Sequence, residues 1–240
     1  MGAEMTKEGG SVNKNRGLTQ EGLKLIACVT MLIDHIGTAL VPMMELRIIG
    51  RLAFPIYCFL LVEGMARTRN TKKYGIRLAI GAVLSEVPFD LLFFGGLTWT
   101  HQSVMITLLL GYLMMLWMRI SPQMQLFAVF VCAGAAELLC TDYGAMGVLM
   151  IAVFALTANR EDRLILQVLG VAALCWLIGG AYVRFSVFRV PVQIFGVLAI
   201  VPIWLYNGRK ATRSKAVQWG FYLFYPVHLA VLLVIMHLWR

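Results

Sequence analysis

An apolar run near the N-terminus, Leu23–Pro42, constrains this chain more than any other stretch. It is long enough to cross the hydrocarbon core of a bilayer as a helix. The run nevertheless contains two adjacent ionisable residues, Asp34 and His35. A carboxylate inside a membrane helix is unfavourable unless another group pairs with it or it faces water. The run therefore predicts a polar site inside the membrane, with its other members on neighbouring spans.

The composition supports a membrane protein. Of the 240 residues, 60% are hydrophobic and only 14% are charged, and the mean hydropathy is +0.79. Soluble domains contain about one quarter charged residues. Several apolar runs of about 16 to 22 residues recur along the chain, and they lack the polar stripes at helical period that a soluble helical core would show. We therefore expect an all-α integral membrane protein.

The apolar runs predict about nine transmembrane helices, with eight and ten as the bounds of that count. They form one domain over residues 21–240, behind a flexible polar arm at residues 1–20. Because that arm is polar, a cleavable signal peptide is not expected. The nine runs are Leu23–Pro42, Ile48–Ala66, Tyr74–Phe94, Ser103–Ile120, Gln123–Cys140, Ala145–Ala158, Leu164–Tyr182, Val190–Tyr206 and Val217–Leu238.

The basic residues indicate the orientation of these spans. If the N-terminus is cytoplasmic, 16 of the 21 Lys and Arg residues fall in cytoplasmic connections or the adjoining helix ends, and 5 fall outside. This asymmetry agrees with the positive-inside rule, so we expect a cytoplasmic N-terminus. The net charge of +9 is then a topology signal, and no nucleic-acid partner is expected.

Two carboxylates of the third span, Glu86 and Asp90, are spaced i,i+4 and project from one helix face. Anions this close in a low dielectric repel unless a cation lies between them, and Arg51 on the second span is the nearest candidate. These groups, with Asp34 and His35, fall in the outer half of the membrane, where we expect one outward-facing polar cavity. An ion pair that only locks two helices together explains the Glu86, Asp90 and Arg51 trio equally well.

His35 is the candidate general base, because imidazole titrates near neutral pH. Asp34 and His35 are about 100° apart around a helix. Asp34 is therefore placed to bond a facing helix, while Glu86 or Asp90 serves His35. His101, at the outer start of the fourth span, is a candidate hydrogen-bond donor to a developing oxyanion.

Of the two other histidines, His228 fits a structural role and His237 an interfacial one. His228 lies mid-membrane beside a proline, and His237 lies near the outer end of the last span. The chain contains no zinc-binding spacing, Walker loop or GxSxG elbow. We therefore expect no metal.

Several blocks of the sequence resemble the TraX family of membrane proteins, named for a conjugative-transfer protein associated with N-terminal acetylation of pilin. The blocks are LKLIACVTMLIDHIG (23–37), RIIGRLAFPIYCFLLVEG (47–64), RTRNTKKY (67–74), LSEVPFDLL (84–92), HQSVMITLLLG (101–111) and TDYGAMGVLMI (141–151). The most specific is GRLAFPIYCFLLVEG with the preceding DHIG. A further block, FYLFYPVHLAVL (221–232), is similar to the last helices of the wider transmembrane acyltransferases.

The resemblance implies an acyltransferase of the bacterial cytoplasmic membrane that uses acyl-CoA as its donor. An acetyl or other short acyl group would pass from cytosolic acyl-CoA to an acceptor outside. His35 would deprotonate the acceptor, and Arg51 or His101 would steady the oxyanion. The pantetheine arm would thread between helices, with its phosphates on a basic loop. The residues assigned to those phosphates are Arg67, Arg69, Lys72 and Lys73.

Other interpretations stay open at this point. The acceptor is a small molecule, a glycan or a peptide N-terminus with an amine or hydroxyl group, and the sequence does not choose among them. The basic loop is explained equally well as a topology determinant. Asp34, His35, Glu86 and Asp90 would also suit the proton relay of a transporter, or the interhelical polar contacts of a non-enzymatic membrane partner.

Overall fold

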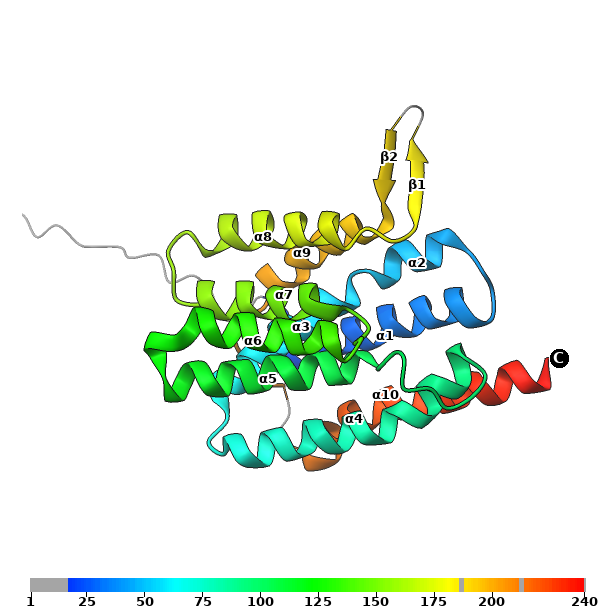
Figure 1. The fold of residues 1–240 in the computed structure, drawn as a ribbon, viewed down its shortest axis with the longest axis horizontal. Helices are drawn as coiled ribbons and strands as arrows, with labels where there is room; N and C mark the ends of the chain where they lie inside the picture. The colour runs from blue at the N-terminus through cyan, green and yellow to red at the C-terminus, as the bar shows by residue number, and fades with distance from the viewer. Residues whose placement is uncertain (1–16, 186–187, 212–213, 240) are drawn as a thin grey trace, which may run out of the picture.

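The computed structural model describes residues 17–185, 188–211 and 214–239, and it is mostly helical (Figure 1). Most of the expected N-terminal arm lies outside the described residues. In chain order the elements are α1 (Gln20–Ala39), α2 (Met44–Gly50), α3 (Ala53–Arg67), α4 (Thr71–Phe93), α5 (Val104–Ile120), η1 (Pro122–Met124), α6 (Gln125–Leu138), α7 (Gly144–Thr157), α8 (Arg163–Ile178), β1 (Tyr182–Phe185), β2 (Phe188–Pro191), η2 (Val192–Ala199), α9 (Ile200–Trp204) and α10 (Lys215–Leu238).

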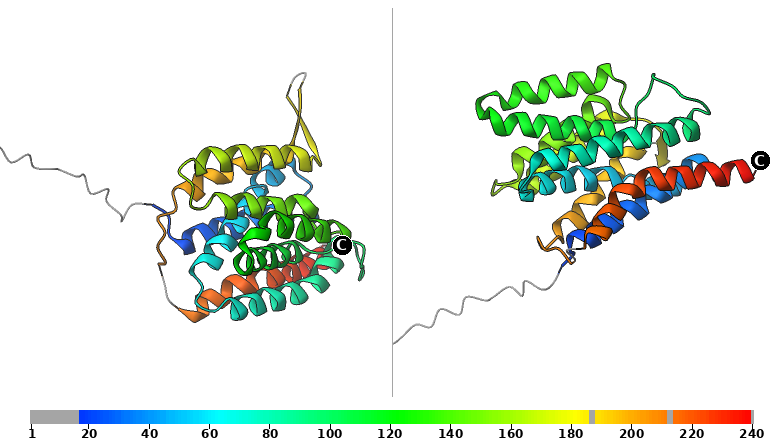
Figure 2. Two further views of the ribbon diagram at one scale, coloured as in Figure 1. Left: turned by 60° about the vertical axis from the view of Figure 1, so that its left-hand side comes forward. Right: turned by 90° about the horizontal axis from the view of Figure 1, so that it is seen from below.

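Three helical stretches are long and apolar enough to cross a membrane, judged by length and composition: Gln20–Ala39, Met44–Arg67 and Ala216–Leu238. Shorter apolar helical stretches occupy most of the region between the second and the third. The helices lie roughly parallel or antiparallel, and successive long elements alternate in direction (Figures 1 and 2). Nine crossings therefore stay a prediction.

The outside of the bundle is apolar. On α6, Leu126 and Phe130 are each 77% exposed and Leu138 is 87% exposed. Ile165 and Leu169 on α8 are also exposed. Large apolar side chains at such positions are unfavourable in water and favourable in lipid. This surface agrees with helices that contact a bilayer.

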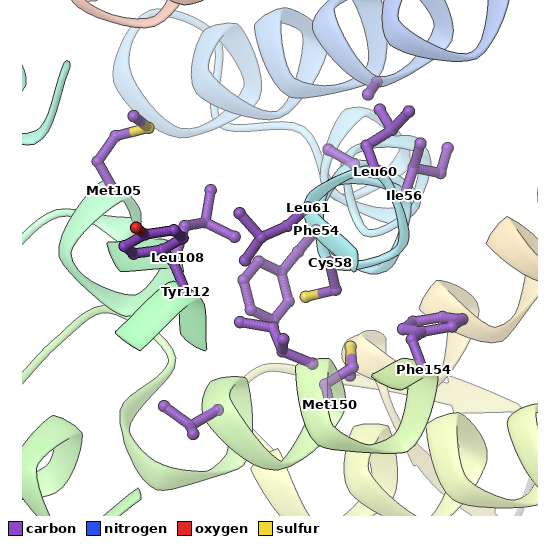
Figure 3. Close-up of a cluster of buried hydrophobic side chains, with 14 of the residues drawn as sticks. Phe54, Ile56, Cys58, Leu60, Leu61, Met105, Leu108, Tyr112, Met150 and Phe154 are labelled. Atoms are coloured by element: carbon purple, nitrogen blue, oxygen red, sulfur yellow. The ribbon is translucent and has the colours of Figure 1, made fainter. Parts of the chain in front are cut away.

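Helix α3 lies at the centre of the bundle. Its side chains Phe54 and Ile56 are buried, and they belong to the same apolar core as Met150 and Phe154 of α7 (Figure 3). Helices α1, α5 and α7 and the 3₁₀ segment η2 all pack against α3. This core fixes the positions of the helices that carry the polar residues.

The second expected span is not one continuous helix. Helix α2 ends at Gly50, and α3 begins at Ala53 after a turn. Pro55 explains the break, because a proline has no N–H to donate to the carbonyl four residues earlier, which is that of Arg51, and its ring clashes there. The break places Arg51 at a corner between two helices.

The all-α expectation is wrong at Tyr182–Phe185 and Phe188–Pro191. Strands β1 and β2 form an antiparallel hairpin that projects from one end of the bundle (Figure 1). The expected eighth span, Val190–Tyr206, begins in this hairpin and continues as η2 and the short α9. Pro191 ends β2 and precedes η2, where its missing N–H is tolerated. Hydropathy alone does not separate such a segment from a regular helix.

Gly50 permits a close contact between α1 and α2. A Cβ atom at this position would lie 2.2 Å from Cβ of Asp34, far inside van der Waals contact. A side chain larger than hydrogen would therefore push α2 away from α1. The close approach holds Asp34 against the corner that carries Arg51.

Candidate functional site

Asp34 turns toward α2, as its angular separation from His35 predicted. Its Oδ1 accepts a hydrogen bond from Nη2 of Arg51 and lies 3.3 Å from Nε of Arg47. Nη1 of Arg51 donates to Oε1 of Gln193 at 3.0 Å. Arg51 and Asp34 are largely buried, with side chains 12% and 16% exposed. This charge network joins α1, α2 and η2.

The expected pairing of Arg51 with Glu86 and Asp90 is wrong. Glu86 accepts hydrogen bonds from the backbone N–H of Ser103 at 3.2 Å and from its hydroxyl. Asp90 accepts one from the backbone N–H of Thr98 at 3.0 Å. Both carboxylates thus hold the loop between α4 and α5 and do not face α2, because α4 packs against α10 and α5.

The polar groups at this end of the bundle form several separate pairs, and the expected single outward-facing polar cavity stays a prediction. His101, the expected oxyanion donor, lies in the loop before α5, and its Nε2 is 3.4 Å from Oδ1 of Asp142. Gln102 pairs with Thr141 beside it. His101 therefore joins two loops at the end of the bundle.

The contact between His101 and Asp142 predicts a pH-dependent link between these loops. The hydrogen bond to Asp142 raises the pKa of His101 above its usual 6.5, against the opposing effect of partial burial. The link is therefore fully present below about pH 6.5 and weakens as the pH rises through the raised pKa. An NMR titration of His101 should show a pKa above 6.5 that falls in Asp142→Asn. An unchanged pKa in that variant would contradict the pairing.

His35 turns away from Asp34 and contacts α10. Its Nδ1 lies 2.7 Å from Nε2 of His228, and Nδ1 of His228 lies 2.8 Å from the carbonyl oxygen of Phe224. The expectation that Glu86 or Asp90 serves His35 is therefore wrong, since a second histidine occupies that position. His228 is only 6% exposed.

A cavity of about 200 Å³ opens at the end of the bundle where α1, α4 and α10 begin, opposite the loops that carry His101 and Asp142. We call this the basic end, because four basic side chains and one acidic side chain line the cavity, a net charge of +3. The charged lining residues are Glu21, Lys24, Arg67, Arg77 and Lys210.

The cavity extends inward toward the histidine pair. Along α1 its lining advances from Lys24 to Met31, which lies one turn before His35. Along α10 it advances to Tyr225. The ring of Tyr225 contacts those of His35 and His228, with centroids 6.2 and 5.5 Å apart respectively. Tyr225 therefore lines the cavity and also contacts both histidines of the pair.

Of the four residues assigned to phosphate binding, only Arg67 is among the described residues that line this cavity. Arg67 is also paired with Glu63 on the same helix. Arg69 lies in the connection before α4, and Lys72 and Lys73 lie in the first turn of α4; all three are exposed and outside the lining. Any anion at the cavity mouth would instead meet basic side chains from α1, α4 and the connection before α10.

The model of the family described as TraX protein matches residues 19–236. The chain belongs to the TraX family. The match covers the cavity, the histidine pair and the Asp34 network together. The resemblance in the N-terminal blocks is therefore confirmed and extends over α10.

Two curated relatives are similar to this chain. A probable fimbrial assembly protein, FimC of serogroup H1, from Dichelobacter nodosus is 31% identical over 92% of this chain and 97% of its own length. An uncharacterized protein, RP591, from Rickettsia prowazekii (strain Madrid E) is 34% identical over 42% of this chain and 38% of its own. No solved structure matches the chain significantly.

In this TraX-family chain, His228 is a site residue that the sequence patterns did not single out. The signal was present, because an ionisable residue within an apolar span indicates a functional site unless a partner explains it. Pro226, two residues earlier, favoured the structural interpretation instead. Lys24 and Arg77 were also missed, because basic residues near span ends serve equally well as topology determinants.

Proposed function

We propose that this protein is a membrane-embedded acyltransferase that moves an acetyl or other short acyl group from acyl-CoA to an amine or hydroxyl acceptor. The observation that carries the proposal is the cavity with a basic mouth and an inner end at Tyr225, beside His35. A positively charged entrance suits the phosphates of coenzyme A. The family relationship supports a role in surface-structure assembly, since one relative is named as a fimbrial assembly protein.

The proposed topology follows from the basic residues gathered around the cavity mouth at one end of the bundle. We place the basic end in the cytoplasm, with nine crossings in the bacterial cytoplasmic membrane. Acyl-CoA then enters from the cytosol, and the acceptor approaches from the hairpin end. A cavity of about 200 Å³ suits a narrow pantetheine arm and a short acyl group, while the nucleotide stays at the mouth.

The chemistry requires one base and no resident cofactor. The acceptor nitrogen or oxygen attacks the thioester carbonyl carbon, and an imidazole nitrogen of His35 takes the acceptor's proton. The carbon–sulfur bond then breaks, and the proton passes to the departing thiolate. The products are the acylated acceptor and coenzyme A with a free thiol.

The decisive experiment is acetyl transfer by the purified protein in proteoliposomes. Labelled acetyl-CoA is supplied with a short peptide that has a free N-terminal amine, and the N-acetylated peptide is the matched control. We expect label in the first peptide and a stoichiometric release of thiol. The experiment is repeated with an acceptor that has a sugar hydroxyl group. If neither acceptor causes thiol release and the protein carries a proton-coupled flux, a transporter is favoured.

The basic mouth makes a prediction about donor affinity. Arg77→Gln and Lys210→Gln should each raise the Kd for acetyl-CoA about tenfold, because each removes a charge-assisted contact with phosphate. The same charge change at Arg69 or Lys72, outside the cavity lining, should leave the Kd unchanged. Calorimetric titration in detergent micelles measures the Kd of each variant. Equal weakening at all four positions would contradict specific phosphate binding.

A further inference from the structure

The contact between the two histidines determines where their protons lie. The carbonyl oxygen of Phe224 only accepts hydrogen bonds, so Nδ1 of His228, 2.8 Å away, carries a proton. A neutral imidazole has one N–H, so Nε2 of His228 is then an acceptor. Nδ1 of His35, 2.7 Å from that nitrogen, must therefore be the donor. Nε2 of His35 is left without a proton.

The opposite arrangement would require His228 to carry both protons. That state places a positive charge on a side chain that is only 6% exposed. Burying a charge without a counterion is strongly unfavourable. The hydrogen-bond partners shown for His228 are His35 and Phe224, and neither carries a negative charge. The neutral pair with one defined tautomer for each ring is therefore favoured.

The ring geometry supports a directional hydrogen bond. The two rings are parallel within 3°, and their centroids are 5.0 Å apart. The centroid separation is about the sum of the 2.7 Å distance between the two nitrogens and the distance from each nitrogen to its own ring centroid. The two nitrogens therefore lie on the line between the centroids. The rings therefore share a plane and meet edge to edge, which aligns the N–H of His35 with the lone pair of His228.

We propose that His228 is a positioning residue that holds His35 in the tautomer whose Nε2 is the base. This inference rests on the proposed acyltransfer, because His228 acts on the acceptor only through His35. Free imidazole side chains exchange between two tautomers, and only one of them presents the correct nitrogen to a given substrate. Fixing the tautomer of a catalytic histidine through the nitrogen opposite the reacting one is an established way to set both its orientation and its basicity.

The test is ¹⁵N NMR of histidine-labelled protein in lipid nanodiscs, with signals assigned by single variants. In the wild type we expect protonated Nδ1 and bare Nε2 for His35. His228→Gln should keep this pattern, because the glutamine carbonyl oxygen accepts the same hydrogen bond. His228→Leu should lose it. A wild-type His35 protonated at Nε2, or a tautomer unchanged in His228→Leu, would overturn the inference.

Transfer rates in the same nanodiscs provide the second readout. With labelled acetyl-CoA and the free-amine peptide, His228→Leu should lower kcat by about 10–10³-fold, with KM for acetyl-CoA unchanged. His228→Gln should restore most of the rate. Equal losses in both variants would indicate a structural role and overturn the inference. The expected tautomer in a wild-type protein that transfers no acetyl group would uphold the assignment of the protons and overturn the proposed function instead.

Discussion

Acetyl transfer should fall by about 10²–10⁴-fold in His35→Ala, because the variant loses the general base of the proposed reaction. The variant should keep its affinity for acetyl-CoA, since His35 is not among the described residues that line the cavity. Single-turnover transfer in proteoliposomes, combined with the binding titration, separates the two effects.

A matched control comes from another histidine. The Nδ1 of His237 lies 2.9 Å from the carbonyl oxygen of Leu233 on α10, which is the same local contact that His228 makes with Phe224. His237→Ala should leave transfer unchanged. If folded His35→Ala protein transferred acetyl groups at the wild-type rate, the histidine pair would be a structural contact between α1 and α10.

The second large effect is expected on stability. Asp34→Leu should lower the free energy of unfolding by about 3–5 kcal/mol, because it leaves the buried guanidinium of Arg51 without its counterion. Arg51→Leu should be milder, since Arg47 also lies within 3.3 Å of Asp34. Removing both partners in Asp34→Leu with Arg51→Leu should recover part of the loss. Unfolding in mixed micelles measures all three variants.

An exposed ion pair serves as the control for this series. Arg160 and Asp162 pair in the connection before α8, with side chains 59% and 46% exposed, and solvent screens such pairs. Arg160→Ala should therefore produce no measurable change in stability. If Asp34→Leu instead kept its stability and lost only transfer, Asp34 would act directly in the reaction and not mainly as the counterion of Arg51.

The sequence predicted the apolar spans better than the contacts among them. Runs such as Leu23–Pro42 follow directly from the thickness of a bilayer, and α1 occupies Gln20–Ala39. The sequence shows Pro55 in the second run, but it does not show whether this proline kinks the helix or breaks it in two, because that depends on the surrounding structure. The hairpin at residues 182–191 was not predictable from hydropathy, because strands and apolar helices of this length share a composition.

The errors at the site have one physical cause. Sequence spacing fixes which residues share a helix face, as for Asp34 and His35, but not which helix lies opposite. Arg51 is the nearest candidate cation on the span before Glu86, whereas α4 packs against α5 and α10. His35 and His228 are 193 positions apart, so only the packing of α1 beside α10 reveals them as a pair.

The separation of the two histidines also bears on biosynthesis. His35 leaves the ribosome on the earliest helix of the described chain and His228 on the latest. A nascent or truncated chain that ends before α10 holds an unpartnered imidazole and has only part of the cavity wall. Under the proposed acyltransfer, a chain that lacks α10 should therefore be unable to consume acyl-CoA, and activity should begin only when this last described helix has inserted.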